Sequence, residues 1–427
     1  MYKRWLPTAG LILATAVAIT LGYGTSSIAA SFTSPMRQLA GRNEPVNYRL
    51  VELPTLGGAQ DFANFINDRG WVTGAADLTG GQSEHAFLWR DGQMLDLGTL
   101  GGSNSLAWPV NDSGEVAGDS VTSTADPLNE NFCHFNIDGV PESTDRTCLG
   151  FVWLRGAMTA LPTLGGNNSQ VFGINNRGQI AGTAEVRRPD PSCVLPQVLD
   201  WKPVVWGPEG EIQQLRVFTG DSVGAVVAIN DVGQAVGGSG MCGPLSPAAS
   251  AHPLLWQGHN VTYLGGFGGV MNNLAFGINN RGQVVGFSDL PGDTTTHAFL
   301  WQNGKMSDLG TLAGDFASFA FGINDRGQVV GQSCDINFNC RAFIWQDGVM
   351  SDLNSLINPR SALYLMLAES INAGGEIAGI AFNQSTGGVP AFAAIPAIGY
   401  GVHPSSKVNL PASVRKRLQQ RSGLGSK

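Results

Sequence analysis

The stretch INNRGQVVG, residues 278–286, is followed by HAFLW at residues 297–301 and by DLGTL at residues 308–312. The first of these segments has the form apolar-Asn-x-x-Gly-x-apolar-x-Gly, and it recurs along the whole chain. The seven copies carry Asn67, Asn111, Asn175, Asn230, Asn279, Asn324 and Asn372. Successive copies are 44 to 64 residues apart, which indicates one supersecondary unit repeated seven times.

Each unit supplies four short strands. Stretches such as QVVG, residues 283–286, suit a pleated, half-buried surface. Asn at the first turn position can bond its own backbone, and Gly at the fourth takes a positive φ without steric cost, so the motif favours a tight hairpin. No amphipathic helical pattern interrupts residues 47–400. Units of about 45 residues with four strands predict a β-propeller.

The two ends of the chain share one unit. Residues 48–58 match the last strand of a unit, and the seventh unit stops after its third strand at residues 390–394. We therefore predict an all-β, seven-bladed propeller of four-stranded blades at 47–400, in which the N-terminal strand completes the last blade as its outer strand. This closure removes the sheet edges that an open array would expose. A shifted register, with the aromatic strand innermost, would also join the two ends.

Composition and charge exclude several classes of protein. The 427 residues include 58 Gly and are 43% hydrophobic, which is typical of neither collagen nor a disordered chain. Beyond the N-terminus no apolar stretch of about 20 residues occurs, which excludes a polytopic membrane protein. Of the net charge of −8, residues 1–30 carry +2 and residues 401–427 carry +6, which leaves −16 on residues 31–400. A body this acidic argues against nucleic acid as a partner.

The N-terminus is typical of an export signal. Lys3 and Arg4 precede the apolar residues 11–21, and small residues at 27–30 offer a cleavage site. We predict a signal peptide at 1–30, with an uncleaved membrane anchor as the alternative, and a linker at 31–46. The predicted location is extracellular or periplasmic. The basic tail at 401–427 is predicted to be flexible, and it is either solvated or in weak contact with a membrane or an anionic polymer.

The repeats resemble the extracellular HAF-repeat family. The resemblance rests on the His-Ala-Phe strands, the Asp-Leu-Gly-Thr-Leu-Gly-Gly segments and the Ile-Asn-x-x-Gly turns, and it covers roughly residues 48–395. The strand-turn-strand layout is also similar to kelch blades, although the kelch double Gly after the second strand is absent. Two copies of the aromatic strand, at residues 150–153 and 203–206, depart from the family pattern because they lack its His, and the seventh copy lacks its Trp. The resemblance implies an exported repeat protein and assigns no reaction to particular residues.

The loops between second and third strands differ in length. Blades two, three and four carry expanded loops at 119–149, 183–201 and 238–251, and these blades are neighbours in the ring. Because loops on a rigid scaffold concentrate binding and catalysis, we predict the contact surface there, with drift of tolerated surface loops as the alternative. All six Cys lie in loops of this class. Their proximity along the chain and the ring favours the disulfides Cys133–Cys148, Cys193–Cys242 and Cys334–Cys340, with a structural role.

Comparison among the repeats identifies two polar residues near the axis. Three residues before the turn Asn, the copies read Asn64, Trp108, Phe172, Val227, Phe276, Phe321 and Glu369. Asn64 and Glu369 replace apolar residues on the adjacent blades one and seven. A desolvated carboxylate at Glu369 could act as a general acid or base, or bind a cation. The alternative is a hydrogen-bonded pair where the ring closes.

Further candidates are weaker. Trp108 and Trp201 lie outside the repeated Trp position and are predicted to contact a ligand by stacking, together with the loop residues His134, Arg187 and Arg188. Asp335, Asn337 and Asn339 place oxygen ligands at alternate positions, as Ca²⁺ loops do, but the usual Gly and closing Glu are missing. No other cofactor is expected. The GDSVG of residues 220–224 matches a nucleophile elbow, which needs a strand-to-helix turn. The recurring His85, His252 and His297 favour a packing role.

These observations predict an exported β-propeller that serves as a rigid binding platform, through the long loops of blades two to four, for an extracellular protein, a glycan or another polymer. The alternative is a secreted enzyme that degrades a polysaccharide or another polymer, as a lyase or hydrolase, with its site near the channel around Glu369. A purely structural envelope component is a third reading. An enzyme should gather several titratable groups in one pocket, whereas a platform should not.

Overall fold

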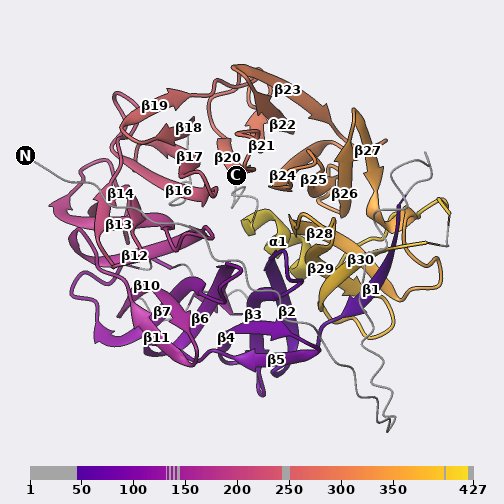
Figure 1. Cartoon of the computed structure of the whole chain (residues 1–427), viewed down its shortest axis with the longest axis horizontal. Coiled ribbons are helices and arrows are strands. Elements are labelled where there is room, and N and C mark those ends of the chain that lie inside the picture. The colour runs from indigo at the N-terminus through magenta and orange to yellow at the C-terminus, as the bar shows by residue number, and fades with distance from the viewer. Residues whose placement is uncertain are drawn as a thin grey trace, which may run out of the picture. The chain divides into compact units, whose positions relative to one another are not determined.

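The computed structural model describes residues 46–130, 132–133, 136–137, 140–141, 145–242, 251–398 and 401–421. Seven four-stranded antiparallel sheets stand around a central axis as the blades of a propeller (Figure 1). The predicted signal peptide, nearly all of the linker, His134 and the last six residues of the predicted tail lie outside the described residues. No helix in the described part of the chain is long and apolar enough to span a membrane.

Blades one to four follow the chain from the axis outward. Blade one has β2 (Gly57–Ile66), β3 (Val72–Leu78), β4 (Glu84–Arg90) and β5 (Gln93–Asp96), and blade two has β6 (Gly101–Val110), β7 (Val116–Ala125), β10 (Arg146–Leu154) and β11 (Ala157–Ala160). Blade three has β12 (Gly165–Ile174), β13 (Ile180–Pro189), β14 (Leu199–Trp206) and β15 (Ile212–Gln214). Blade four has β16 (Val223–Ile229), β17 (Gln234–Gly240), β18 (His252–Gln257) and β19 (Asn260–Tyr263). A small hairpin, β8 (Asn136–Ile137) with β9 (Val140–Pro141), lies between β7 and β10.

Blades five to seven complete the ring. Blade five has β20 (Asn273–Ile278), β21 (Val284–Asp289), β22 (Thr296–Gln302) and β23 (Lys305–Gly310). Blade six has β24 (Ala317–Ile323), β25 (Val329–Cys334), β26 (Cys340–Gln346) and β27 (Val349–Asp352). Blade seven has β28 (Leu363–Ile371), β29 (Ile377–Asn383), β30 (Ala391–Ala397) and β1 (Asn47–Glu52). A 3₁₀ turn, η2 (Leu353–Ser355), follows β27.

The predicted closure is confirmed. β1 pairs antiparallel with β30, from Asn47 opposite Ala397 to Glu52 opposite Phe392, and it forms the outer strand of blade seven. The innermost strand of every blade ends at the turn Asn, so the alternative register with the aromatic strand innermost is wrong. The N-terminal strand therefore covers the edge of β30 and completes blade seven as a four-stranded sheet.

The turn motif works as predicted and also links the blades. In blade one, Asn67 Oδ1 accepts hydrogen bonds from the backbone N–H groups of Arg69 and Trp71, at 3.0 and 2.9 Å, and Gly70 has a φ of +74°. In addition, the Nδ2 of each of the seven turn Asn residues donates to the backbone carbonyl of the turn Asn in the next blade, at 2.9 to 3.2 Å. The motif therefore forms a closed ring of buried hydrogen bonds around the axis.

The core lies between adjacent blades. The Phe of the aromatic third strand is fully buried in five blades, at Phe87, Phe151, Phe299, Phe343 and Phe392. The repeated Trp contributes to the same interfaces: Trp206 Nε1 donates to the carbonyl of Pro162, in the connection from blade two to blade three, at 2.9 Å. Packing between blades rather than within them holds the ring together, because each sheet has an apolar face toward each neighbour.

Two boundaries differ from those expected. β7 extends to Ala125 and β13 to Pro189, so parts of the predicted loops 119–149 and 183–201 are continuous strand. Residues 401–421 belong to the same compact unit as the propeller, although the sequence placed them in a flexible tail. They form an extended segment followed by α1 (Ala412–Arg421), whose Val414 and Leu418 are buried against the propeller. The apolar side chains of this short helix are the physical reason for the difference.

Candidate functional site

A cavity of about 470 Å³, here called the axial cavity, lies along the axis of the ring. The innermost strands of all seven blades line it, and the position three residues before each turn Asn faces into it in every blade. The sequence comparison at that position therefore identified residues that surround one space. Cys133, Trp201, Val223 and Gly240 extend the lining to the face that carries the loops between second and third strands, here called the long-loop face.

Aromatic side chains form much of the cavity wall. Trp108 and Phe172, from blades two and three, meet edge to face with ring centroids 5.6 Å apart. Phe276 and Phe321, from blades five and six, meet in the same way at 4.9 Å. Such pairs hold the rings in fixed orientations, so the wall is rigid before a ligand arrives.

A buried carboxylate orients Trp108. Its Nε1 donates to Asp119 Oδ2 at 3.0 Å, and Asp119 Oδ1 accepts from the backbone N–H of Val171, in blade three, at 2.7 Å. Burial raises the pKa of Asp119 to about 8, although both hydrogen bonds lower it. Asp119 therefore holds Trp108 in place and links blade two to blade three.

The two predicted polar positions lie in the wall of the same cavity, on adjacent blades. Glu369 is 9% exposed and Asn64 is 6% exposed. Asn64 Nδ2 donates to the carbonyl of Ala107, in blade two, at 2.9 Å, so this amide also links blades one and two. Glu369 is the one charged residue among those that line the axial cavity in the described chain.

Gln170 is a lining residue that the sequence reasoning missed. It is 7% exposed, and its Oε1 has no hydrogen-bond partner among the described residues. Five residues before the turn Asn, its counterparts are all apolar: Phe62, Leu106, Ala225, Leu274, Phe319 and Leu367. The same comparison among repeats, made two positions earlier, would have found it.

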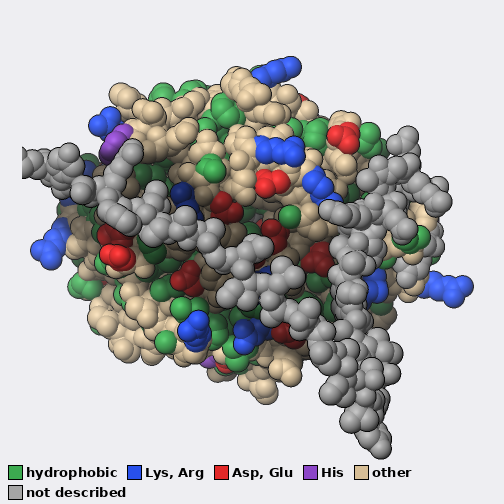
Figure 2. All heavy atoms as spheres, in the orientation of Figure 1, with side chains coloured by type: hydrophobic (Ala, Val, Ile, Leu, Met, Phe, Trp, Pro, Cys, Tyr) green, Lys and Arg blue, Asp and Glu red, His purple; other side chains and the backbone are tan. Residues whose placement is uncertain are grey.

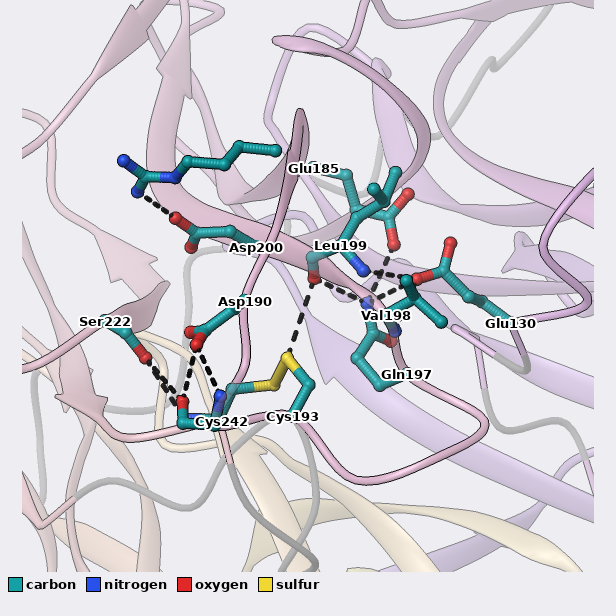
Figure 3. The surroundings of a disulfide bond; sticks show 12 residues. Glu130, Glu185, Asp190, Cys193, Gln197, Val198, Leu199, Asp200, Ser222 and Cys242 are labelled. Carbon is teal, nitrogen blue, oxygen red and sulfur yellow. Dashed lines mark hydrogen bonds and ion pairs between the residues drawn. A yellow bond between two sulfur atoms is a disulfide. The ribbon is translucent and has the colours of Figure 1, made fainter.

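The long loops of blades three and four are joined above the cavity. The Cys193–Cys242 disulfide links them, and Cys133–Cys148 and Cys334–Cys340 are also formed, so all three predicted pairs are confirmed. Disulfides are typical of an oxidising compartment, which agrees with export. Figure 3 shows Asp190 beside the Cys193–Cys242 bridge. These three residues are the one compact metal-ligand group in the described chain, but the sulfurs are bonded to each other.

A buried carboxyl pair connects the loops of blades two and three. Gln197 Nε2 donates to Glu130 Oε1 at 3.1 Å and to Glu185 Oε1 at 2.9 Å, so both carboxyl groups converge on one amide (Figure 3). Burial, together with the Glu130 carboxylate, raises the pKa of Glu185. Glu130 also accepts from the backbone N–H groups of Val198 and Leu199, at 2.8 and 2.7 Å. These contacts fix the blade-three loop beside Trp201.

The remaining predicted binding residues lie in two places. Trp201 is 3% exposed and lines the cavity. Arg187 and Arg188 are exposed near the end of β13 and do not line it; Arg188 pairs with Asp200 at 2.6 Å. His134 lies outside the described residues.

The predicted Ca²⁺ loop uses its oxygens for other contacts. Asp335 Oδ1 accepts from the backbone N–H groups of Asn337 and Asn339, at 2.9 and 3.0 Å. Asn339 Oδ1 accepts from the N–H of Leu410, and the carbonyl of Asn337 accepts from Arg415, so this loop receives the C-terminal segment.

Two further sequence candidates have structural roles here. Ser222 precedes strand β16 rather than a helix, so the GDSVG sequence does not form the nucleophile elbow. His85 Nδ1 contacts Asp96 at 2.9 Å and His297 Nδ1 contacts Asp308 at 2.9 Å, each across strands three and four of one blade. The His of the third strand and the Asp of the fourth are therefore partners within a blade.

A second cavity of about 170 Å³ lies at the opposite end of the axis, inside the turns. The residues after the turn Asn surround it and read Asp68, Asp112, Asn176, Asp231, Asn280, Asp325 and Ala373. The side-chain oxygens of the Asp and Asn residues accept from backbone N–H groups of the neighbouring blade, as when Asn176 N–H donates to Asp231 Oδ1 at 2.8 Å. This ring belongs to the closure of the fold.

Comparisons with known proteins find similar solved structures at low sequence identity. No family model and no curated protein matches the chain, so the HAF-repeat resemblance stays a prediction. Among solved structures, the chain is similar to virginiamycin B lyase from Staphylococcus aureus, at 10% identity and a TM-score of 0.47, over 82% of this chain and 100% of that one. It is also similar to a gluconolactonase from Xanthomonas campestris, at 11% identity, TM-score 0.37, and 84% and 99% coverage. An acylaminoacyl peptidase from Pyrococcus horikoshii matches at 10% identity, TM-score 0.42, over 78% of this chain and 51% of that one.

Proposed function

We propose that this protein is an exported binding protein whose site is the axial cavity and the long loops of blades two to four that border it. The observation that carries the proposal is the composition of the cavity wall: rigid aromatic and aliphatic side chains with a few polar groups and one titratable side chain, Glu369. Pockets of this composition and of about 300–1,000 Å³ are typical of small-molecule sites.

The cavity volume limits the bound group. It holds one small organic molecule, or the terminal unit of an extracellular glycan, protein or other polymer. The Cys193–Cys242 disulfide and the Glu130–Gln197–Glu185 contacts order the bordering loops before binding, which lowers the entropy lost on association. A polymer partner would extend from the cavity across the long-loop face.

An enzyme is the second candidate, because Glu369 is a largely buried carboxylate in the wall. General acid–base chemistry ordinarily uses more than one titratable group or a positioned partner. Glu369→Gln separates the two functions: it should abolish turnover if the carboxylate is the acid or base, while an uncharged ligand should still bind.

The test is a screen of purified protein against small molecules, glycans and extracellular polymers, recording both binding and product release. Ala225→Phe is the blocking variant, because Ala225 lines the cavity and blades one and six carry Phe at the equivalent position. Ala157→Phe, at an exposed position of β11, is the control. Binding that is lost in Ala225→Phe and kept in Ala157→Phe supports the proposal, and equal binding by both variants contradicts it.

A further inference from the structure

Gln170 points to the kind of ligand that the axial cavity accepts. Six of the seven blades place an apolar residue at this position, whereas blade three places an amide with a buried Oε1 that no described residue contacts. A buried acceptor without a donor lowers the stability of the folded protein. A ligand that donates a hydrogen bond to Oε1 would recover that cost.

The charges around the cavity favour a cation. The lining residues include Glu369 and no Lys, Arg or His, and the whole chain, with the docked basic segment included, carries a net charge of −8. Figure 2 shows acidic side chains toward the middle of the face in view, with Lys and Arg side chains both among them and at the rim. An anionic ligand would meet no opposite charge in the wall and would lose its hydration. A cationic ligand would be attracted by Glu369 and by the field of the whole body.

The aromatic wall fits the same kind of ligand. Gln170 and Phe172 are two residues apart on β12, and both line the cavity on either side of the register shift between Val171 and Gly173. The amide acceptor therefore lines the same cavity as the Trp108–Phe172 pair. Aromatic faces attract an ammonium group electrostatically and also pack against an apolar body.

We propose that the axial cavity binds an organic ammonium ion with an aromatic or aliphatic body. The ammonium group donates to Gln170 Oε1, Glu369 supplies the opposing charge in the wall, and the apolar body packs against the aromatic pairs. This inference rests on the proposed function, because it specifies the ligand class of the same cavity.

The experiment compares three probes of nearly equal shape: 4-phenylbutylammonium, 4-phenylbutanol and 4-phenylbutanoate, titrated at pH 7 into the full-length protein by calorimetry or ligand-observed NMR. We expect the ammonium ion to bind about tenfold or more tighter than the carboxylate, and tighter than the alcohol. Gln170→Leu introduces the residue type that blade two has at the equivalent position. This substitution should lower the affinity for the ammonium ion about tenfold and leave the unfolding midpoint unchanged or raised.

Gln332→Leu is the matched control. Gln332 is fully buried in β25, its Oε1 and Nε2 have no partner among the described residues, and it does not line the cavity. The same substitution there should affect stability in the same direction and leave the affinity for all three probes unchanged.

The outcomes separate the two proposals. Equal binding of the three probes, blocked in each case by Ala225→Phe, would show a cavity that binds ligands of another class and would overturn the ammonium assignment. Full ammonium affinity in Gln170→Leu would overturn it as well. If no probe binds while the screen of small molecules, glycans and polymers finds a ligand that Ala225→Phe blocks, the ammonium assignment alone fails. If Ala225→Phe binds the probes as the wild type does, the proposed function itself fails.

Discussion

Asn372 Nδ2 donates to the backbone carbonyl of Asn67 at 2.9 Å, across a separation of 305 residues. This hydrogen bond is the last member of the ring formed by the seven turn Asn residues, and it joins blade seven to blade one. The β1–β30 pairing joins the outer strands of blade seven itself. The ring is therefore closed twice, once at the axis and once at the rim.

The first prediction concerns the closure at the axis. Asn372→Asp keeps the Oδ atom that accepts from the N–H of Glu376, but it removes the donor to Asn67 and places a carboxylate beside Glu376 Oε2. We expect the free energy of unfolding to fall by about 2–3 kcal/mol. Asn358→Asp is the control, since Asn358 is exposed and makes an equivalent turn contact with the N–H of Arg360. Denaturant titration measures both, and equal losses would contradict the role of the ring.

The second prediction ranks two disulfides. Cys193–Cys242 closes a loop of sequence separation 49, and Cys334–Cys340 closes one of 6. Because the entropy removed from the unfolded chain grows with loop length, replacing the first pair by Ser should cost about 4 kcal/mol and the second about 2 kcal/mol. Reversed losses in thermal or denaturant unfolding would be evidence against the entropic account. Ligand affinity should fall with the first replacement, since that bridge orders the loops beside the cavity.

The third prediction concerns Asp61, which is 1% exposed and whose carboxyl oxygens have no partner among the described residues. Burial, reinforced by nearby carboxylates, raises the pKa of Asp61 to about 7. Between about pH 4 and pH 7 the unfolded chain has released this proton and the folded chain retains it, so the free energy of unfolding falls as the pH rises. In blade two the equivalent Ser105 Oγ accepts from the N–H of Ala86 in the preceding blade at 2.9 Å.

Asp61→Ser should therefore stabilise the protein, by roughly 2–4 kcal/mol more at pH 8 than at pH 4. The reciprocal variant Ser105→Asp should destabilise it, with a greater loss at pH 8. Unfolding free energies measured at both pH values test the pair. A pH-independent effect of Asp61→Ser would show that the carboxyl group does not titrate in this range.

Repeats determine how much could be predicted from the sequence. Comparison among the seven repeats predicts the number of blades, the closing strand and the residues that face the axis. Asn64, Glu369 and Trp108 lie where that comparison placed them. The same comparison among repeats, made two positions earlier, would also have identified Gln170. It would not have identified the Glu130–Glu185 pair, because its loops have no counterpart in other blades. Long-range pairing of two unrelated loops leaves no periodic signal.

The C-terminal segment was mispredicted for a related reason. Val414 and Leu418 are four residues apart, as expected for one helix face, but the surrounding sequence is basic and the helix has only ten residues. Their burial depends on an apolar surface assembled from blades that are distant in sequence. Lys407 adds an ion pair with Asp315 at 2.5 Å, and Ser405 Oγ donates to Asp352.

The last prediction tests this docking. Leu418 is 2% exposed and packs in the same cluster as Phe321, which lines the axial cavity. Leu418→Ala should lower the free energy of unfolding by about 2–4 kcal/mol if unfolding of the helix is coupled to that of the ring. Lys416→Ala, at an exposed position two residues earlier, should change it by less than about 0.5 kcal/mol.

Limited proteolysis distinguishes coupled from local unfolding of this segment. If α1 detaches alone, Leu418→Ala leaves the main transition unchanged, and cleavage within residues 401–421 becomes faster. If α1 is part of the cooperative unit, both the transition and the cleavage change together. We expect the coupled result, because Lys407, Leu410 and Arg415 attach the segment to the loops of blades five and six as well as to the core cluster. Wild-type protection in Leu418→Ala would contradict the docking itself.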